Sequence, residues 1–131
     1  MRIAVTGCRI YEDKRKVREF LSKLKSDYGT DIDILSGGSK SGIDTYAKKF
    51  SLDFGFRYIE YNPFFTVHNL YSRFSKEYYS KPYHVSQFHK RNEIMISECD
   101  YLACFIYNTS PIKNIEVLLK AAKKHEVPYV L

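Results

Sequence analysis

Apolar residues along the chain alternate between short continuous runs and stretches with helical spacing. The short runs predict strands at residues 2–6, 32–35, 56–61, 101–106 and 128–131. Apolar positions three and four residues apart predict helices at 13–28, 43–54, 86–98 and 112–125. Glycines follow the first two of these helices, at positions 29 and 55, where helices commonly end.

Strands that alternate with helices favour right-handed crossovers and a parallel sheet covered on both faces. We therefore predict one Rossmann-like, three-layer α/β/α domain over residues 1–131, with five mainly parallel strands in the order 3-2-1-4-5. In this order the direction of winding reverses between the first and fourth strands, and such folds bind ligands at the carboxyl ends of the strands there. Three loops should meet at this crevice, at residues 7–9, 37–41 and 108–110.

Residues 62–85 interrupt the alternation with many aromatic side chains in an otherwise polar stretch. Three interpretations are open: a lid over the crevice, an interface between subunits, or a local aromatic core. A lid would stack on a base, and the candidates are Phe64, Phe65, Tyr71, Tyr79 and Tyr83. Tyrosines interleaved with basic residues also suit single-stranded nucleic acid, whose bases stack and whose phosphates pair with cations.

Composition limits the class of protein. The length of 131 residues suits one ordinary domain, and no apolar run approaches the ~18 residues of a membrane span. The amino terminus becomes polar too early for a signal peptide. Three cysteines without a C-x-x-C pair cannot all form disulfides, which favours a reducing compartment, and Cys99 and Cys104 fit a core. We expect a soluble cytoplasmic protein with no membrane partner.

The chain is basic, with a net charge of +6 and a pI of about 9.2. This balance favours an anionic partner such as a nucleotide, a nucleic acid or an acidic surface. A solvated basic face explains it equally well, because the charge is spread through the helices. The four histidines lack ligand spacing, so neither a metal nor another cofactor is expected.

The stretch LSGGSKSGID at residues 35–44 has the composition of an anion-binding turn. Glycines allow backbone N–H groups to approach an anion, and the start of the next helix adds unpaired donors. Serine hydroxyls and one lysine add further donors, and Asp44 can cap the helix or reach a ribose hydroxyl. The candidate residues are Gly37, Gly38, Ser39, Lys40, Ser41, Gly42 and Asp44. An ordinary turn has a similar composition, and neither common phosphate-binding glycine motif is present.

Three motifs in this order resemble those of a known group. Residues 5–9, V-T-G-C-R, resemble its V-T-G-S-R opening, and residues 37–44, G-G-S-K-S-G-I-D, resemble its G-G-A-x-G-A-D element. Residues 89–95, H-K-R-N-E-I-M, with Asp100 five residues later, resemble its R-N-x-x-M helix. The chain is identified as a member of the SLOG superfamily, nearest the small YspA-like branch found in bacterial and phage genomes. The lonely-guy phosphoribohydrolases and the DNA-processing protein DprA are more distant members.

This resemblance implies a Rossmann-like fold that binds a nucleotide or nucleotide-derived molecule, as a sensor or a sponge. The motif positions expected to face the ligand are Gly7, Arg9, Gly37, Gly38, Gly42, Asp44, Arg91 and Asn92. The adjoining loop positions Cys8, Ser39, Lys40, Ser41, Asn108, Thr109 and Ser110 complete the predicted site. Arg9 and Arg91 suit a phosphate, because one guanidinium bonds two oxygens at once. We also expect a homo-oligomer.

Two alternatives follow from the same resemblance. A lonely-guy-type enzyme would cleave a nucleoside 5'-monophosphate at its glycosidic bond, with Arg91 and Glu116 as catalytic residues. The family glutamate follows a P-G-G-x-G-T motif, whereas residues 108–116 contain no glycine, and Glu116 fits a helix surface as well. The second alternative is binding of single-stranded nucleic acid in the manner of DprA, expected to be weak.

Overall fold

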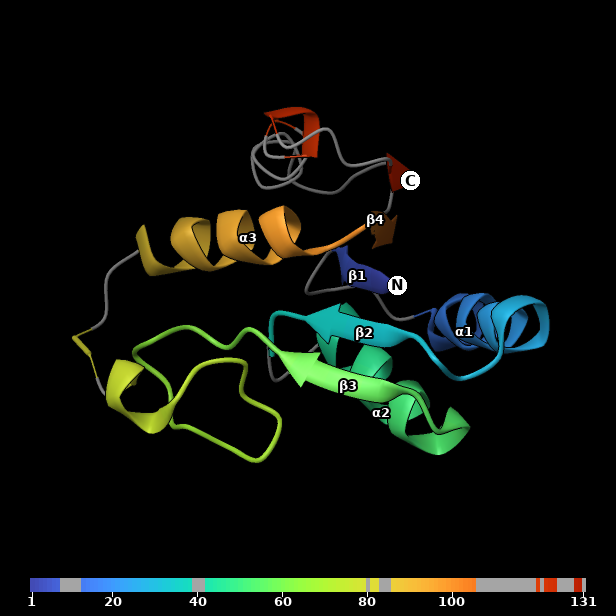
Figure 1. The fold of residues 1–131 in the computed structure, drawn as a ribbon, viewed down its shortest axis with the longest axis horizontal. Coiled ribbons are helices and arrows are strands. Elements are labelled where there is room, and N and C mark those ends of the chain that lie inside the picture. The colour runs from blue at the N-terminus through green and yellow to red at the C-terminus, as the bar shows by residue number, and fades with distance from the viewer. Residues whose placement is uncertain are drawn as a thin grey trace.

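A five-stranded sheet forms the centre of the structure (Figure 1). The computed structural model describes residues 1–7, 13–38, 42–79, 81–82, 86–105, 120, 122–124 and 129–130. The strands are β1 (Arg2–Gly7), β2 (Asp33–Ser36), β3 (Arg57–Glu60), β4 (Tyr101–Phe105) and β5 (Tyr129–Val130). The helices are α1 (Lys14–Tyr28), α2 (Ile43–Phe54) and α3 (Ser86–Glu98), with a short 3-10 helix η1 (Lys76–Tyr78).

The strand order is β3-β2-β1-β4-β5, and each neighbouring pair is parallel. The predicted order, strand direction and Rossmann-like class are therefore confirmed. The ends of the observed elements lie within two residues of the predicted ones wherever both are described. Most of the helix predicted at 112–125 lies outside the described residues, although 120 and 122–124 are helical. The winding reverses between β1 and β4, as expected.

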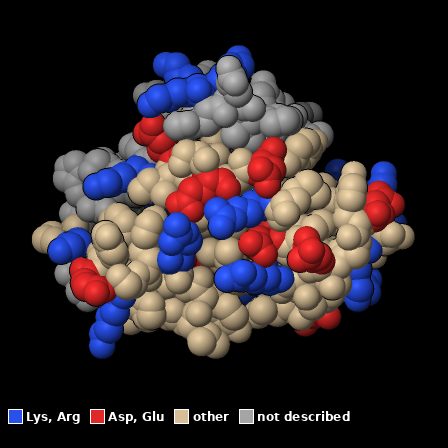
Figure 2. Space-filling view, viewed as in Figure 1, with Lys and Arg blue, Asp and Glu red and all other residues tan. Residues whose placement is uncertain are grey.

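Acidic and basic side chains mix on the surface that faces the viewer in Figure 1. In the space-filling view of the same face, Lys and Arg lie beside Asp and Glu and do not gather into one basic patch (Figure 2). Several of the described cations pair with acids, for example Arg73 with Glu98 at 3.0 Å and Lys49 with Asp53 at 3.0 Å. Exposed pairs of this kind add little stability, because water and salt screen them.

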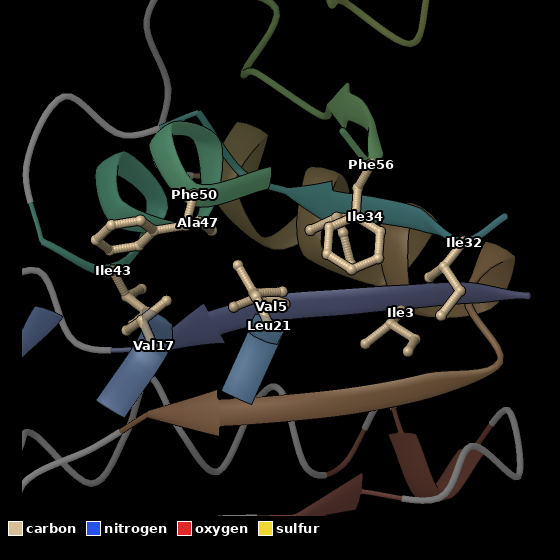
Figure 3. Close-up of a cluster of buried hydrophobic side chains, with 10 residues drawn as sticks. All are labelled: Ile3, Val5, Val17, Leu21, Ile32, Ile34, Ile43, Ala47, Phe50 and Phe56. Atoms are coloured by element: carbon tan, nitrogen blue, oxygen red, sulfur yellow. The ribbon is translucent and has the colours of Figure 1, made fainter. Parts of the chain in front are cut away.

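Two apolar clusters cover the two faces of the sheet. Ile3 and Val5 of β1 pack with residues of α1 and α2 in the first cluster, which Figure 3 shows. Ala4, between them in the sequence, packs in the second cluster with Met95 and Ile96 of α3. Successive side chains of a strand point to opposite faces, so one strand supplies both clusters. The described residues therefore form the predicted three layers.

Local sequence explains where the first two helices begin and end. The Asp13 side chain accepts a hydrogen bond from the Lys16 backbone N–H and caps the start of α1. The N–H of Gly29 bonds to the carbonyl of Lys25 at the end of α1. Gly55, with a φ of 84°, ends α2 in the left-handed conformation that glycine adopts easily.

The aromatic segment continues from the edge strand β3 and folds back against it. The Glu60 N–H donates to the Tyr71 carbonyl at 2.8 Å, and the Arg73 N–H donates to the Glu60 carbonyl at 2.9 Å. These bonds form an isolated parallel bridge between Glu60 and Ser72. The segment thereby covers part of a sheet edge, which would otherwise be open to pairing with another chain.

Within the segment, the rings pack against one another. The Phe64 ring lies 5.5 Å from that of Phe74, 5.9 Å from Tyr78 and 5.7 Å from Tyr79, measured between centroids. The described part of the segment therefore packs as a local aromatic core, while the lid and the subunit interface stay predictions. Two apolar side chains stay outside this core, because Val67 is 81% exposed and Leu70 is 88% exposed.

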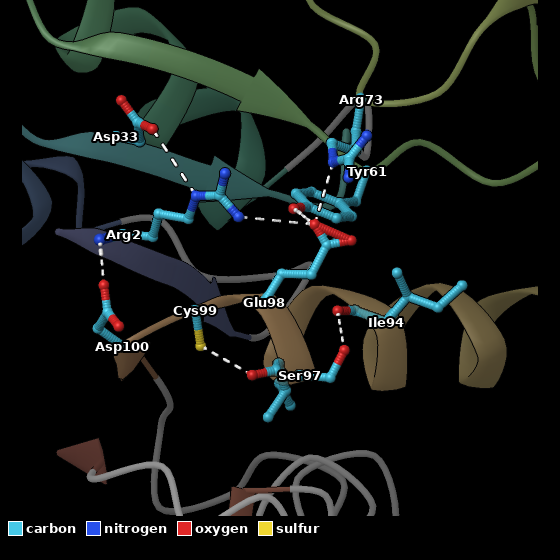
Figure 4. Close-up of polar contacts among 10 residues, drawn as sticks. Arg2, Asp33, Tyr61, Arg73, Ile94, Ser97, Glu98, Cys99 and Asp100 are labelled. Carbon is cyan, nitrogen blue, oxygen red and sulfur yellow. Dashed lines mark hydrogen bonds and ion pairs between the residues drawn. The ribbon is translucent and has the colours of Figure 1, made fainter.

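Glu98, at the end of α3, connects this segment to the rest of the fold (Figure 4). Its carboxylate accepts hydrogen bonds from the Tyr61 hydroxyl and from Arg73 Nε, each at 3.0 Å. Arg2 of β1 lies 3.8 Å from the same carboxylate. The end of β3, the aromatic segment, α3 and β1 therefore share one polar cluster.

The two described cysteines are buried, as predicted. Burial raises the pKa of the Cys99 thiol to about 11 and that of Cys104 to about 12. Because the thiolate is the reactive form, both thiols are poor nucleophiles. Among the described helices, none has the length and apolar character needed to cross a membrane.

Cys104 provides a prediction about alkaline stability. Its ordinary pKa is 9.0, and the folded value is about 12, so the unfolded chain loses this proton first as the pH rises. The contribution of the buried thiol is complete below pH 9 and decreases by about 1.4 kcal/mol per pH unit above it. The free energy of unfolding of Cys104→Ala, measured with urea from pH 9 to 11, should therefore fall less steeply than that of the parent. Parallel curves would contradict the prediction.

Candidate functional site

Most of the buried polar residues lie at one edge of the sheet. In the described part of the chain they are Thr6, Ser36, Asp44, Ser51, Glu60 and Asn62. All but Ser51 lie at the carboxyl ends of β1, β2 and β3, or in the first turn of α2, which follows β2. Burying polar groups is costly, and their concentration at one end of a sheet whose other buried residues are hydrophobic marks a candidate site. This is the edge that the strand order predicts.

Gly7 is the last residue of β1 at this edge, and packing explains why this position is a glycine. A β-carbon at this position would collide with the carbonyl oxygen of Phe105, which pairs with Gly7 across the sheet. The close approach of β1 and β4 therefore requires a residue without a side chain. The neighbouring predicted residues Cys8 and Arg9 lie outside the described residues.

Gly37, Asp44 and Arg91 come together from three elements. Arg91 Nη1, on α3, donates a 2.6 Å hydrogen bond to the carbonyl of Gly37, which directly follows β2. A β-carbon on Gly37 would collide with this guanidinium and lie 3.1 Å from Asp44 Oδ2 on α2. The structure thus brings together three residues that the motifs assigned to one site. A guanidinium beside a glycine backbone and a helix N-terminus suits an anion.

Gly38 lies directly over two residues that the sequence pattern did not single out, Glu60 and Asn62. Its φ is +75°, and a β-carbon there would lie 2.7 Å from Glu60 Cγ and 3.1 Å from Asn62 Cβ. Both side chains are buried, with 5% and 4% of their surface exposed. The alternation of Phe56, Tyr58 and Glu60 along β3 is the signal that places Glu60 on a buried face.

Hydrogen bonds satisfy the Glu60 carboxylate from two sides. The Tyr58 hydroxyl donates to Oε1 at 3.0 Å, and Asn69 Nδ2 donates to Oε2. Burial and then the charge of Glu60 raise the pKa of the Tyr58 hydroxyl far above its ordinary value. Tyr58 is therefore a permanent donor to this carboxylate. Ser36 pairs with Glu60 across the sheet and completes this group of polar side chains.

The remaining predicted residues fall into three sets. Gly42 and Asn92 are half-buried, at the start of α2 and on α3. Of the stacking candidates, Tyr79 is buried with its hydroxyl on Asn62, and Phe64 packs in the aromatic core. Phe65 and Tyr71 are half-buried, and the Tyr71 ring contacts Tyr58 and Lys48. The predicted residues outside the described part of the chain are Cys8, Arg9, Ser39, Lys40, Ser41, Tyr83, Asn108, Thr109, Ser110 and Glu116.

The side chains described at this edge can bind a ligand through hydrogen bonds. Their groups are one guanidinium, two buried carboxylates, amides and hydroxyls. Within the described residues, no group of three or more histidine, cysteine, aspartate or glutamate side chains converges as a metal site would require.

A protein-family model matches the first half of the chain. The model of the YspA, cpYpsA-related SLOG family matches residues 1–68. The chain belongs to this family. The match includes β1, Gly37 and Gly38 (hereafter the glycine turn), Asp44, Glu60 and Asn62, whereas Arg91 lies beyond it. A comparison with curated proteins gave no match.

Solved structures share the fold at low sequence identity. The single-stranded-DNA-binding DNA processing protein A of Helicobacter pylori is 18% identical with a TM-score of 0.71, over 98% of this chain and 63% of that one. The Moco carrier protein of Chlamydomonas reinhardtii is 20% identical with a TM-score of 0.58, covering 99% and 74%. The molybdenum cofactor binding protein of Rippkaea orientalis is 15% identical with a TM-score of 0.61, covering 99% and 88%. This chain therefore spans less than two thirds of the Helicobacter protein.

The contact between Gly38 and Glu60 predicts an unequal response to alanine at two glycines. Gly38 and Gly55 both have positive φ, but a β-carbon on Gly55 meets no atom within 4 Å. Gly55→Ala should cost only the backbone strain, roughly 1–2 kcal/mol. Gly38→Ala should cost about 1–3 kcal/mol more, because the methyl group overpacks the site. Urea unfolding of both variants measures the difference, and equal losses would exclude a tight contact at Gly38.

Proposed function

We propose that this protein binds a nucleotide or a nucleotide-derived small molecule at the carboxyl ends of β1, β2 and β3. The observation that carries the proposal is the convergence of Gly37, Asp44 and Arg91 at an edge lined by buried polar groups. This set combines a cation, an acceptor and a glycine backbone. Those are the groups that a phosphate and a ribose require.

Each group has a separate task in this proposal. The phosphate lies at the glycine turn, where the positive end of the α2 dipole and the Arg91 guanidinium stabilise its charge. The Asp44 carboxylate accepts hydrogen bonds from ribose hydroxyls. Phe65 and Tyr71, two half-buried aromatic residues near β3, are the proposed contacts of the base. Tyr79 is buried and the Phe64 ring packs against Phe74, so these two lie less open to a ligand.

The ligand must be inferred from these residues and not from the similar structures. One of those proteins binds single-stranded DNA and two bind the molybdenum cofactor, as their names state, so the shared fold accommodates different ligands. We further propose that residues 1–131 act as one binding domain, a sensor or a sponge, in a homo-oligomer. Binding is the function proposed because the described groups at this edge are ones that hold a ligand. Glu116, which glycosidic cleavage would use, lies outside the described residues.

Removing the guanidinium should weaken nucleotide binding. A hydrogen bond to a charged group contributes about 1.5–3 kcal/mol, so Arg91→Ala should lower the affinity for a bound nucleoside monophosphate roughly 10- to 100-fold. Calorimetric titration with a panel of nucleoside mono- and diphosphates measures the loss. The matched control is Arg57→Ala, whose exposed side chain lies on the first residue of β3, at the amino ends of the strands. It removes the same charge at the opposite edge of the sheet and should leave the affinity unchanged.

The same titrations separate the alternatives. Equal affinity for the parent and a folded Arg91→Ala variant would overturn the proposed site. Release of free base during the titration would indicate the glycosidic enzyme. Tight binding of an oligonucleotide with a steep dependence on salt would indicate a nucleic-acid-binding protein, since each phosphate contact releases counterions.

A further inference from the structure

Glu60 joins two parts of the molecule that are far apart in sequence. On one side it binds the aromatic segment: its backbone pairs with Tyr71 and Arg73, and its carboxylate accepts from Asn69 Nδ2. On the other side, its Cγ and Cδ lie directly under Gly38. The position of the glycine turn therefore depends on where this carboxylate is held.

Asn62, two residues further on, likewise contacts both the aromatic segment and Gly38. Its Nδ2 donates to Thr66 Oγ1 at 3.0 Å and to the Val67 carbonyl at 3.1 Å. Its Oδ1 accepts from the hydroxyls of Ser72 and Tyr79. All the hydrogen-bonding capacity of this amide is used within the segment, while its Cβ faces Gly38. The segment at residues 62–79 is thus built around the two side chains that form the floor of the turn.

We infer that Glu60 is a positioning residue for the binding site, and that Asn69 acts on the site through it. Asn69 donates to the carboxylate from the aromatic segment, and Tyr58 donates to it from β3, so the two donors fix its orientation. The carboxylate in turn sets where Gly38 lies and where the Gly38 N–H points. The predicted effect on affinity rests on the proposed function, whereas the effect on Gly38 does not.

A carboxylate is the group that this position requires. It accepts at both oxygens and donates at neither, and here it meets one donor on each side. Glu60 is only 5% exposed, so water cannot replace a lost partner. An amide at position 60 has only one acceptor and would present a donor to either Tyr58 or Asn69.

This chemistry allows a test by exchange of donor and acceptor. Asn69→Asp places a second carboxylate against Glu60 and breaks the contact by repulsion. Glu60→Gln disturbs it, because the introduced amide can accept from only one of the two donors, Tyr58 and Asn69, and turns its N–H toward the other. The double variant Glu60→Gln/Asn69→Asp restores it, because the introduced glutamine amide donates to the introduced aspartate and still accepts from the Tyr58 hydroxyl. The negative charge moves to the segment, but the geometry is kept.

The first measurement uses the ligand-free proteins. Amide NMR signals of Gly37 and Gly38 should shift in both single variants and return toward the parent position in the double variant. The amides of Gly29 and Gly55, at the ends of α1 and α2, serve as internal references. Leu70→Asp is the matched control, because it adds a carboxylate beside Asn69 on a side chain that is 88% exposed. It should leave the Gly38 signal in place.

The second measurement is the affinity for adenosine monophosphate as the probe. Each single variant should bind it at least roughly tenfold more weakly, and the double variant should recover most of the loss. A double variant that restores the Gly38 signal but not the affinity would assign the charge of Glu60 itself to the ligand and overturn the positioning role. An unchanged Gly38 signal in Asn69→Asp would also overturn it.

Tyr58→Phe repeats the test without adding a charge, in case Asn69→Asp does not fold. It removes the second donor, so the Gly38 signal should shift there too. If the parent protein does not bind the probe at all, the proposed function fails for this nucleotide. The NMR comparison still decides whether Glu60 positions Gly38.

Discussion

The parallel pairing of β1 with both β2 and β4 is the constraint on which the rest of the structure depends. β1 lies in the middle of the sheet, and the strand order departs from it in opposite directions. Since all described pairs are parallel, the carboxyl ends of the strands meet at a single edge. The glycine turn after β2, the last residues of β3 and the first turn of α2 are brought to this edge by the topology alone. At this edge the backbone of Phe105 leaves no room for a β-carbon on Gly7.

Glu60 and Asn62 can be buried at this edge because hydrogen bonds satisfy their side chains. Glu60 and Asn62 have almost no contact with water, and each would destabilise the fold if it lacked partners. The aromatic segment supplies those partners through Asn69, Ser72 and Tyr79. Its rings pack against one another, and hydrogen bonds from Tyr61 and Arg73 to Glu98 connect it to α3. A segment whose composition allows a lid is thus also the support for the floor beneath the glycine turn.

The family match and the site complement each other. The matched residues 1–68 contain the glycine turn, Asp44 and the two buried polar residues at the end of β3. Arg91 comes from α3, beyond the matched region, and reaches the turn through its bond to the Gly37 carbonyl. Arg91 and Gly37, which this hydrogen bond joins, are therefore 54 residues apart in sequence. A loop that is ordinary in composition becomes a candidate anion site only when this side chain lies beside it.

The order of strands and helices could be predicted from the sequence because it depends on local periodicity and on the handedness of crossovers. The glycine turn, Asp44 and Arg91 could be predicted as site residues because their motifs are contiguous in sequence. Glu60 alternates with Phe56 and Tyr58, which puts it on their face of the strand, but this pattern does not show that the face stays covered at the strand end, and Asn62 has no such signal. A glutamate and an asparagine at the end of a strand are usually exposed. Only the tertiary structure decided that Glu60 and Asn62 are buried, because that depends on the aromatic segment folding back over β3 and on Gly38 lying above them. Such contacts form between residues far apart along the chain, and no local pattern encodes them.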